Sequence, residues 1–365
     1  MTLTTARTGT LGNLRGTLLG FATRVTTPLL PADYLDVIDP LRSGTRLRGR
    51  ITAILPETRD AVTVVITPGT GWRGHRPGQF LRIGVAVEGV LHWRCYSITS
   101  APRRADGSLS ITVKAVPGGV VSNHLVRHAS PGTLVLLDQA AGEFTLDEPA
   151  PARILFLTAG SGITPVMGIL RSPALAGDHD IVVVHSAPTA GEVMFGGELR
   201  MLARAGRIRL IEVHTRTDGR LNPGRLTELV GDLTDRHTWS CGPDDFLQMV
   251  ESHWAAAGIA HQLRTERFRS TALATGDGGT VTFSATGCVI ESDGTRNLLE
   301  AGETAGVLMP SGCRMGICFG CVAPLRRGAV RDLRNGALTT ATDDGDGVVI
   351  QTCVSAAAGD CDIDL

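Results

Sequence analysis

Two different patterns of apolar and polar residues cover most of the chain, each over its own segment. Between residues 46 and 138, apolar positions alternate with polar ones in short β-branched runs, which predicts strands. The expected strands cover 47–55, 61–67, 80–87, 92–97, 109–116 and 134–138. Turn clusters rich in Gly, Pro and Arg separate them. Short strands at this spacing are typical of an antiparallel barrel or sandwich.

From residue 153 onward, continuous apolar runs alternate with helical stretches. Strands are expected at 154–157, 181–185, 208–214 and 237–241, and helices at 165–171, 197–205 and 244–257. This alternation predicts a parallel, doubly wound sheet. After a segment with few apolar residues, strands at 279–285 and 288–292, a helix at 298–302 and a cysteine-rich loop form a third unit.

These changes of pattern divide the chain into five segments. We expect an N-terminal extension over 1–44, a β-barrel domain over 45–149, an α/β domain over 150–267, a linker over 268–278 and a third domain over 279–365. The extension contains several helix breakers and one predicted helix over 32–38. Its apolar residues either pack on the first domain or form a docking face, and the pattern does not reveal its role.

Composition limits the class of protein. A chain of 365 residues is too long to fold around a single hydrophobic core, and its length suits two or three domains. With 42% apolar and 19% charged residues, and no apolar run long enough to cross a bilayer, we expect a soluble protein without stable membrane insertion. Gly, Arg and Asn interrupt the first 21 residues, so the sequence predicts no secretory signal and a cytoplasmic location.

The charge is balanced overall but unevenly distributed. The chain has 35 basic and 36 acidic residues, which argues against the basic surface that nucleic-acid binding requires. From Thr280 to the end, however, the sequence has eleven acidic residues and only six arginines, which gives a net charge of −5. This asymmetry favours an electrostatically steered encounter with a basic partner, although an ordinary surface can also carry it.

Four of the eight cysteines occur close to the C-terminus in a distinctive spacing. Cys313, Cys318, Cys321 and Cys353 follow the C-x4-C-x2-C pattern with a distant fourth cysteine, in which thiolates hold a 2Fe-2S cluster. Glycines between them allow the backbone to wrap around a cluster. A zinc site would favour two paired short spacings, and here only one pair fits. The loop closely resembles the 2Fe-2S ferredoxin family, which implies an α+β (β-grasp) fold for the third domain.

A second motif has the chemistry that a flavin requires. Arg94 supplies a cation, Tyr96 an aromatic ring and Ser97 a hydroxyl, all at the end of one predicted strand. These residues resemble the R-x-Y-S motif of the ferredoxin-NADP reductase superfamily. The following segment resembles that family's pyrophosphate loop, where amides at a helix N-terminus bind phosphate. The resemblance implies FAD, rather than FMN, bound by Arg94, Tyr96, Ser97, Lys114, Gly118, Gly119, Val121 and Ser122.

A third motif lies at the first strand-to-helix junction of the α/β domain. Gly160 and Gly162 permit a sharp turn, while Thr164 is expected to cap the helix and Pro165 to occupy its first position. The turn resembles the nicotinamide-binding motif of the same superfamily. Cys241, Gly242 and Pro243 stand where that family places its second nicotinamide motif, so Cys241 is expected beside the nicotinamide ring.

The resemblance also implies roles for residues near the end of the α/β domain. Glu266 is expected to assist proton handling and Phe268 to pack near the flavin, so Ser97, Cys241 and Glu266 are the candidate catalytic residues. A 2′-phosphate requires arginines, and Arg216, Arg220 and Arg225 follow the third predicted strand. Because no acidic residue ends the second strand, we favour NADPH over NADH, with Arg216 and Arg225 as cofactor ligands.

The three motifs together predict an oxidoreductase. The order flavin, nicotinamide, ferredoxin resembles the reductase components of bacterial oxygenases, desaturases and cytochromes P450, most closely actinobacterial ones. Such a protein would pass electrons from NAD(P)H through FAD and a 2Fe-2S cluster to its partner. Two alternatives remain open: a redox sensor or electron-transfer module without significant turnover, and a terminal reductase of a small-molecule acceptor.

Overall fold

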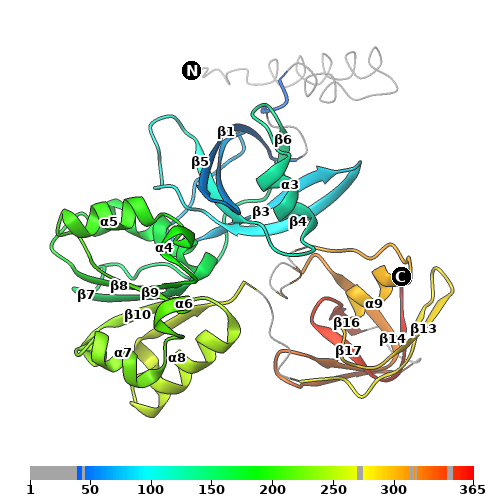
Figure 1. Cartoon of the computed structure of the whole chain (residues 1–365). Helices are drawn as coiled ribbons and strands as arrows, with labels where there is room; N and C mark the ends of the chain where they lie inside the picture. Colours follow the sequence, from blue (N-terminus) through cyan, green and yellow to red (C-terminus); the bar gives the residue numbers. More distant parts are fainter. Residues whose placement is uncertain are drawn as a thin grey trace, which may run out of the picture.

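The computed structural model describes residues 39–42, 46–268, 274–312, 314, 316, 319–342 and 348–365. Figure 1 shows three bodies of secondary structure that follow one another along the chain. The helix predicted over 32–38 and two predicted cluster ligands, Cys313 and Cys318, lie outside the described residues. Among the described helices, none combines the length and the apolar character needed to cross a membrane.

The first body is an antiparallel barrel, as the alternating pattern predicts. Its sheet has the order β4-β3-β6-β1-β2-β5, and a bridge between Ile98 and Ile111 joins the two edges. Residues on one face of each strand, such as Ile51, Val64 and Leu81, are fully buried inside. The elements are β1 (Arg48–Thr58), β2 (Ala61–Pro68), β3 (Phe80–Val87), β4 (Val90–Ser97), β5 (Leu109–Lys114), α3 (Val120–Arg127) and β6 (Leu134–Leu137).

The second body is a five-stranded parallel sheet with the order β11-β10-β7-β8-β9. Helices cover both of its faces, because one core joins Phe156 to α4 and α5 and a second joins Leu157 to α7 and α8. The predicted doubly wound architecture is therefore confirmed. The strands are β7 (Arg153–Ala159), β8 (Asp180–Ala187), β9 (Arg209–His214), β10 (His237–Cys241) and β11 (Leu263–Glu266).

The helices of this body are α4 (Ile163–Leu170), α5 (Gly196–Arg204), α6 (Thr215–Asp218), α7 (Pro223–Leu229) and α8 (Asp244–Ala256). Short 3₁₀ turns occur at Gly160–Gly162, Pro173–Leu175, Ala190–Glu192, Leu233–Asp235 and Ala260–Gln262.

The third body is a mixed sheet with one helix packed against it. Its order is β13-β12-β17-β14-β15, with β16 paired to β14, and only β12 and β17 run parallel. This α+β arrangement agrees with the predicted ferredoxin-like fold. The elements are β12 (Gly279–Phe283), β13 (Cys288–Ser292), α9 (Leu298–Thr304), β14 (Val322–Asp332), β15 (Leu338–Ala341), β16 (Val348–Gln351) and β17 (Ser355–Ile363).

The start of α4 corrects one expectation. The helix begins at Ile163, directly after the 3₁₀ turn, and Gly162 occupies the N-cap position without a side-chain cap. Thr164 therefore lies inside the first turn, where its hydroxyl donates to the Ser161 carbonyl at 2.9 Å. Pro165 is the third helical residue, which is tolerated because the first turn needs no backbone donor there.

Candidate functional site

The predicted flavin motif lies at the end of β4. Arg94, Tyr96 and Ser97 pair across to β3, and burial raises the pKa of Tyr96 well above its usual range, so the phenol stays neutral. Ser97 is only 4% exposed, and its buried Oγ has no hydrogen-bond partner among the described residues. A buried hydroxyl of this kind usually serves a ligand or water. This side-chain set therefore fits a flavin.

Arg94 of the flavin motif lies within the electrostatic influence of the cysteine-rich loop. Its Nη1 donates to the Trp93 carbonyl at 2.7 Å. Burial lowers the pKa of Arg94, and the neighbouring positive charge of Arg314 lowers it further. Arg314 follows the first cluster cysteine and forms a bidentate ion pair with Glu303 of α9. The loop that carries the predicted cluster ligands thus approaches the strand that carries the predicted flavin ligands.

The predicted pyrophosphate loop forms the turn between β5 and α3. Gly118 adopts a left-handed φ of 71°, and Gly119 is the N-cap of α3 without a side-chain cap. Ser122 Oγ accepts from the Val116 amide at 3.3 Å, which holds the loop in place. The Val121 side chain is buried in the barrel core. Lys114 lies at the end of β5 and forms an ion pair with Asp60 at 3.2 Å.

The predicted nicotinamide motifs meet at the carboxyl edge of the parallel sheet. Gly160 adopts a left-handed φ of 55° before α4 begins. A Cβ atom on Gly162 would lie 2.0 Å from the Cys241 carbonyl oxygen, so only glycine fits there. This close approach places the turn directly against Cys241 and Gly242. Pro243 then forms the N-cap of α8.

Cys241 and Glu266 stand side by side at this edge. They are register partners on β10 and β11, and Thr158 of β7 flanks Cys241 on the other side. Burial raises the pKa of Cys241 well above its usual value, and the Glu266 charge adds to this effect. Burial also raises the pKa of Glu266 to about 8. Although part of Glu266 reaches solvent, its Oε2 is buried without a hydrogen-bond partner among the described residues.

The remaining predicted ligands occupy different surroundings. Arg216 lies exposed on α6, with no ion pair within the described part of the chain. Arg220 is instead paired with Asp245, and Arg225 with Asp218. Phe268 packs, partly buried, against the core of the parallel-sheet domain. Arg216 is therefore the predicted arginine whose charge is most available to an anion.

Two of the four predicted cluster ligands fall within the described residues. The sulfurs of Cys321 and Cys353 lie 3.1 Å apart in a buried position. A disulfide would require about 2.05 Å, so these sulfurs converge without bonding. Thr352 donates through its hydroxyl to the Cys321 carbonyl at 2.8 Å, fixing one ligand against the other. The donor chemistry and this convergence fit an iron–sulfur cluster.

Sequence reasoning missed the residues that support this loop. Arg334 Nη1 and Gln351 Nε2 both donate to the Gly316 carbonyl, at 3.0 and 3.1 Å. The hydrogen bond from Arg334 to Asp332 raises the pKa of Arg334, so its guanidinium stays charged beside the loop. No sequence spacing marks these residues, because Arg334 reaches the loop from the turn after β14 and Gln351 from the end of β16.

Comparison with known proteins identifies two domains. Residues 70–146 match the oxidoreductase FAD-binding domain, and residues 281–358 match the 2Fe-2S iron-sulfur cluster binding domain. An NADPH oxidoreductase of Mycobacterium tuberculosis (strain H37Rv) is 48% identical over 351 residues, covering 94% of this chain and 91% of that protein. The chain belongs to the flavin and 2Fe-2S reductases of the ferredoxin-NADP reductase superfamily.

Further relatives agree with this assignment. The ferredoxin reductase component of 3-ketosteroid-9-alpha-monooxygenase from M. tuberculosis (strain CDC 1551) is 34% identical over 279 residues, covering 70% of this reductase and 76% of that protein. Phthalate dioxygenase reductase superposes with a TM-score of 0.60 at 23% identity, covering 87% of this reductase and 97% of that structure, and so shares the fold. The chain is therefore an oxidoreductase with an FAD-binding domain and a 2Fe-2S cluster binding domain.

The raised pKa of Glu266 predicts a pH dependence of stability. The unfolded carboxyl titrates near 4.5 and the folded one near 8, so the folded state holds more protons between these values. The free energy of unfolding should therefore fall as pH rises from 4.5 through 8, by about 1.4 kcal/mol for each unit of effective shift. Thermal unfolding of wild type and Glu266→Gln from pH 5 to 9 measures this.

The Gln variant should lose much of this pH dependence, because its amide does not titrate. Glu228→Gln, on the exposed surface of α7, is the matched control and should behave as wild type. Equal slopes for wild type and Glu266→Gln would contradict the prediction.

Proposed function

We propose that this chain is the NADPH-dependent reductase component of an oxygenase system in the cytoplasm. The proposal assigns residues 45–149 to FAD, 150–267 to the nucleotide and 279–365 to the cluster. The observation that carries it is the order of three sites along one chain: the FAD-binding match over residues 70–146, the glycine turn at Gly160–Gly162 and the 2Fe-2S match over residues 281–358. A donor site, a flavin site and a cluster site in this order form one electron path.

The residues have distinct roles in this proposal. Arg94 and Lys114 neutralise the phosphates of FAD together with the amides after Gly118, while Tyr96 and Ser97 seat the ring. Gly160, Gly162 and Thr164 admit the nucleotide. Bound flavin supplies the exchange between paired electrons from a nicotinamide and single electrons for a cluster.

The nicotinamide and the cluster each depend on a further set of side chains. Cys241 and Glu266, whose raised pKa values favour their uncharged forms at neutral pH, flank the nicotinamide, and Gly242 and Pro243 shape this edge. Phe268 packs near the flavin in this proposal. The cluster ligands in this proposal are Cys313, Cys318, Cys321 and Cys353.

The visible spectrum of the purified protein tests the proposal most directly. Flavin and cluster bands should be present, and both should bleach on anaerobic addition of NADPH. Steady NADPH oxidation with cytochrome c as acceptor would separate a reductase from a redox sensor without turnover. A colourless preparation after reconstitution with iron, sulfide and FAD would overturn the assignment.

Coenzyme preference should depend on Arg216. A charge-assisted hydrogen bond contributes about 1.5–3 kcal/mol, so Arg216→Gln should lower kcat/KM for NADPH about 10- to 100-fold while leaving NADH unchanged. Arg220→Gln is a suitable control, because Arg220 is already paired with Asp245. Steady-state kinetics with both coenzymes measure the effect. An equal loss for NADPH and NADH would show that Arg216 does not bind the 2′-phosphate.

The partner is proposed to be an oxygenase, a desaturase or a cytochrome P450. Relatives of this chain are named as reductase components of monooxygenases acting on 3-ketosteroids and on glycine betaine. The net charge of −5 from Thr280 onward favours an acceptor with a basic docking surface. Added salt should then slow electron transfer to the natural acceptor.

A further inference from the structure

Helix α4 connects the nucleotide turn to the flavin strand. At its start, Gly162 lies against the Cys241 carbonyl. Near its end, a Cβ atom on Gly168 would lie 2.4 Å from the carbonyl oxygen of Ile98, the residue that follows the flavin motif. Backbone therefore touches backbone at both ends of the helix. Any tilt of α4 against the barrel would change the separation of the two sites.

Arg171, the C-cap residue of α4, fixes this contact. Its Nη1 donates to the Thr99 carbonyl at 2.6 Å, and Thr99 lies two residues after Ser97. Its Nε and Nη2 donate to the two carboxylate oxygens of Glu198, at 2.9 and 2.5 Å. The planar guanidinium thus joins the barrel, α4 and α5 in a fixed geometry, which a flexible ammonium would not reproduce.

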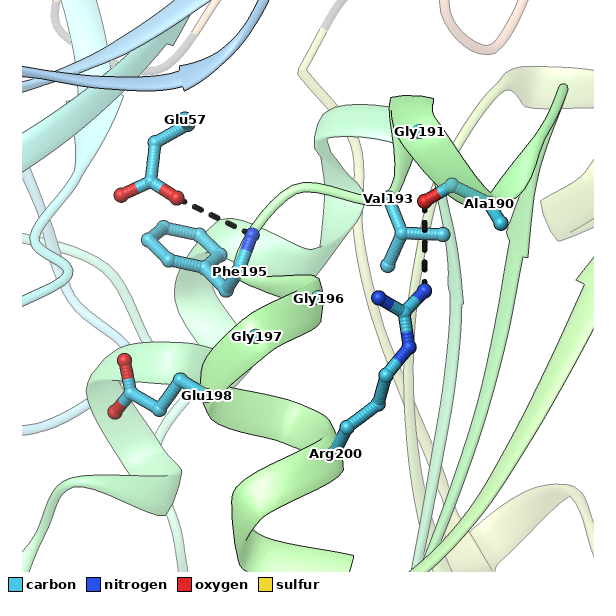
Figure 2. A pocket seen from close by; sticks show the side chains of 9 residues that line it. All are labelled: Glu57, Ala190, Gly191, Val193, Phe195, Gly196, Gly197, Glu198 and Arg200. Atoms are coloured by element: carbon cyan, nitrogen blue, oxygen red, sulfur yellow. Dashed lines mark hydrogen bonds between the residues drawn. The ribbon is translucent and has the colours of Figure 1, made fainter.

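A second contact holds α5 against the barrel. The Phe195 amide at the N-cap of α5 donates to Glu57 Oε2 at 3.3 Å, and Glu57 Oε1 accepts from the Thr63 hydroxyl at 2.7 Å. The Arg171 guanidinium lies 5.1 Å from the Phe195 ring centroid. Figure 2 shows Glu57, Phe195 and Glu198 around one pocket beside α5. Both helices are therefore attached to the barrel at neighbouring points.

We propose that Arg171 is a positioning residue that sets the placement of the nicotinamide against the flavin. This inference rests on the proposed function. Glu198 orients the guanidinium, and the Thr99 carbonyl, two residues beyond the end of the flavin strand, is the point of the barrel that the guanidinium binds. Hydride transfer depends steeply on distance, since a misplacement of about 1 Å can cost about 100-fold in rate. Loosening this contact should thus slow the transfer more than it weakens binding.

The test compares Arg171→Gln, Arg171→Lys and Glu198→Gln in the FAD-loaded full chain. Anaerobic stopped-flow measurement of flavin reduction gives the limiting rate and the NADPH dissociation constant separately. We expect Arg171→Gln to lower the limiting rate about 10- to 100-fold while the dissociation constant changes less than about threefold. The deuterium isotope effect with 4-deuterated NADPH should rise, and Arg171→Lys should restore only part of the rate.

Hydrogen–deuterium exchange supplies a readout independent of turnover. Amides of residues 97–100 and of α4 should exchange faster in Arg171→Gln and Glu198→Gln than in wild type. Arg236→Lys is the matched structural control, because Arg236 pairs with Asp232 and Asp180 inside the nucleotide domain, away from the barrel contact. It should lower the Tm without changing the limiting rate.

The outcomes separate this inference from the proposed function. If NADPH fails to reduce the flavin in wild type, the proposed function is wrong. If wild type is reduced but Arg171→Gln is reduced equally fast, only the positioning role is wrong. A rate loss in Arg236→Lys as large as in Arg171→Gln would also overturn it. If Arg171→Gln does not fold, Glu198→Gln, which leaves the arginine in place, decides by the same criteria.

Discussion

Replacing Cys321 with Ala is expected to abolish electron delivery to cytochrome c while sparing NADPH-driven reduction of ferricyanide. The variant removes one of two sulfurs that converge to 3.1 Å and leaves the barrel and parallel sheet untouched. Because even the outer partners of metal ligands change affinity or activity about 10- to 100-fold, loss of a ligand should lower cytochrome c reduction at least about 100-fold. Parallel assays with the two acceptors measure the split.

Cys288→Ala provides the control for this experiment. Cys288 lies on β13 of the same domain, partly exposed and outside the predicted ligand set. The control should retain the cluster absorbance and both activities. Full cytochrome c reduction by Cys321→Ala would show that electrons leave the protein by a route that does not need the cluster.

Gly162→Ala is expected to disable the nucleotide site. The added Cβ would lie 2.0 Å from the Cys241 carbonyl oxygen and 2.8 Å from the Gly242 nitrogen, so β10 and the turn must separate. Overpacking of this kind costs about 1–3 kcal/mol of stability. A separation of about 1 Å at a reacting site lowers the rate about 100-fold, so NADPH-driven flavin reduction should fall accordingly.

Gly197→Ala is the matched control for this variant. Gly197 lies in α5 of the same domain, and its Cβ position meets open space. Alanine there should keep wild-type rates, with a Tm equal to or slightly above wild type. Dithionite reduction of the flavin should be unchanged in both variants. This result would show that Gly162→Ala impairs the reaction with NADPH and not the flavin itself. Normal NADPH reduction in Gly162→Ala would refute the steric argument.

The fold could be predicted where local pattern and tertiary environment agree. β3, β10 and β13 begin and end at the residues that alternation or continuous apolar character indicates. The barrel, the parallel sheet, the FAD and 2Fe-2S cofactors and the reductase family were predictable because each depends on a short motif or a repeated period. The roles of the individual site residues, such as Ser97 and Glu266, stay predictions.

Elements that depend on distant partners could not be predicted. β14 contains Pro324 and Gly328, and β17 is rich in Ala and Asp, so neither sequence favours a strand. They form because each pairs with the other across the sheet. The roles of Arg171 and Arg334 could not be predicted for the same reason. Each arginine donates to a backbone carbonyl that lies far away in the sequence. The N-cap of α4 was misassigned because a glycine turn replaced the expected side-chain cap.

The position of β17 in the third sheet has a consequence for biogenesis. Strand β17 lies between β12 and β14, so the sheet has no continuous hydrogen-bonded ladder until β17 is inserted. Cys353 lies two residues before β17, in the short turn after β16, and its sulfur lies 3.1 Å from that of Cys321 in the folded sheet. Cluster insertion can therefore follow only the closure of this sheet, whereas the barrel and the parallel sheet form their ladders from their own strands.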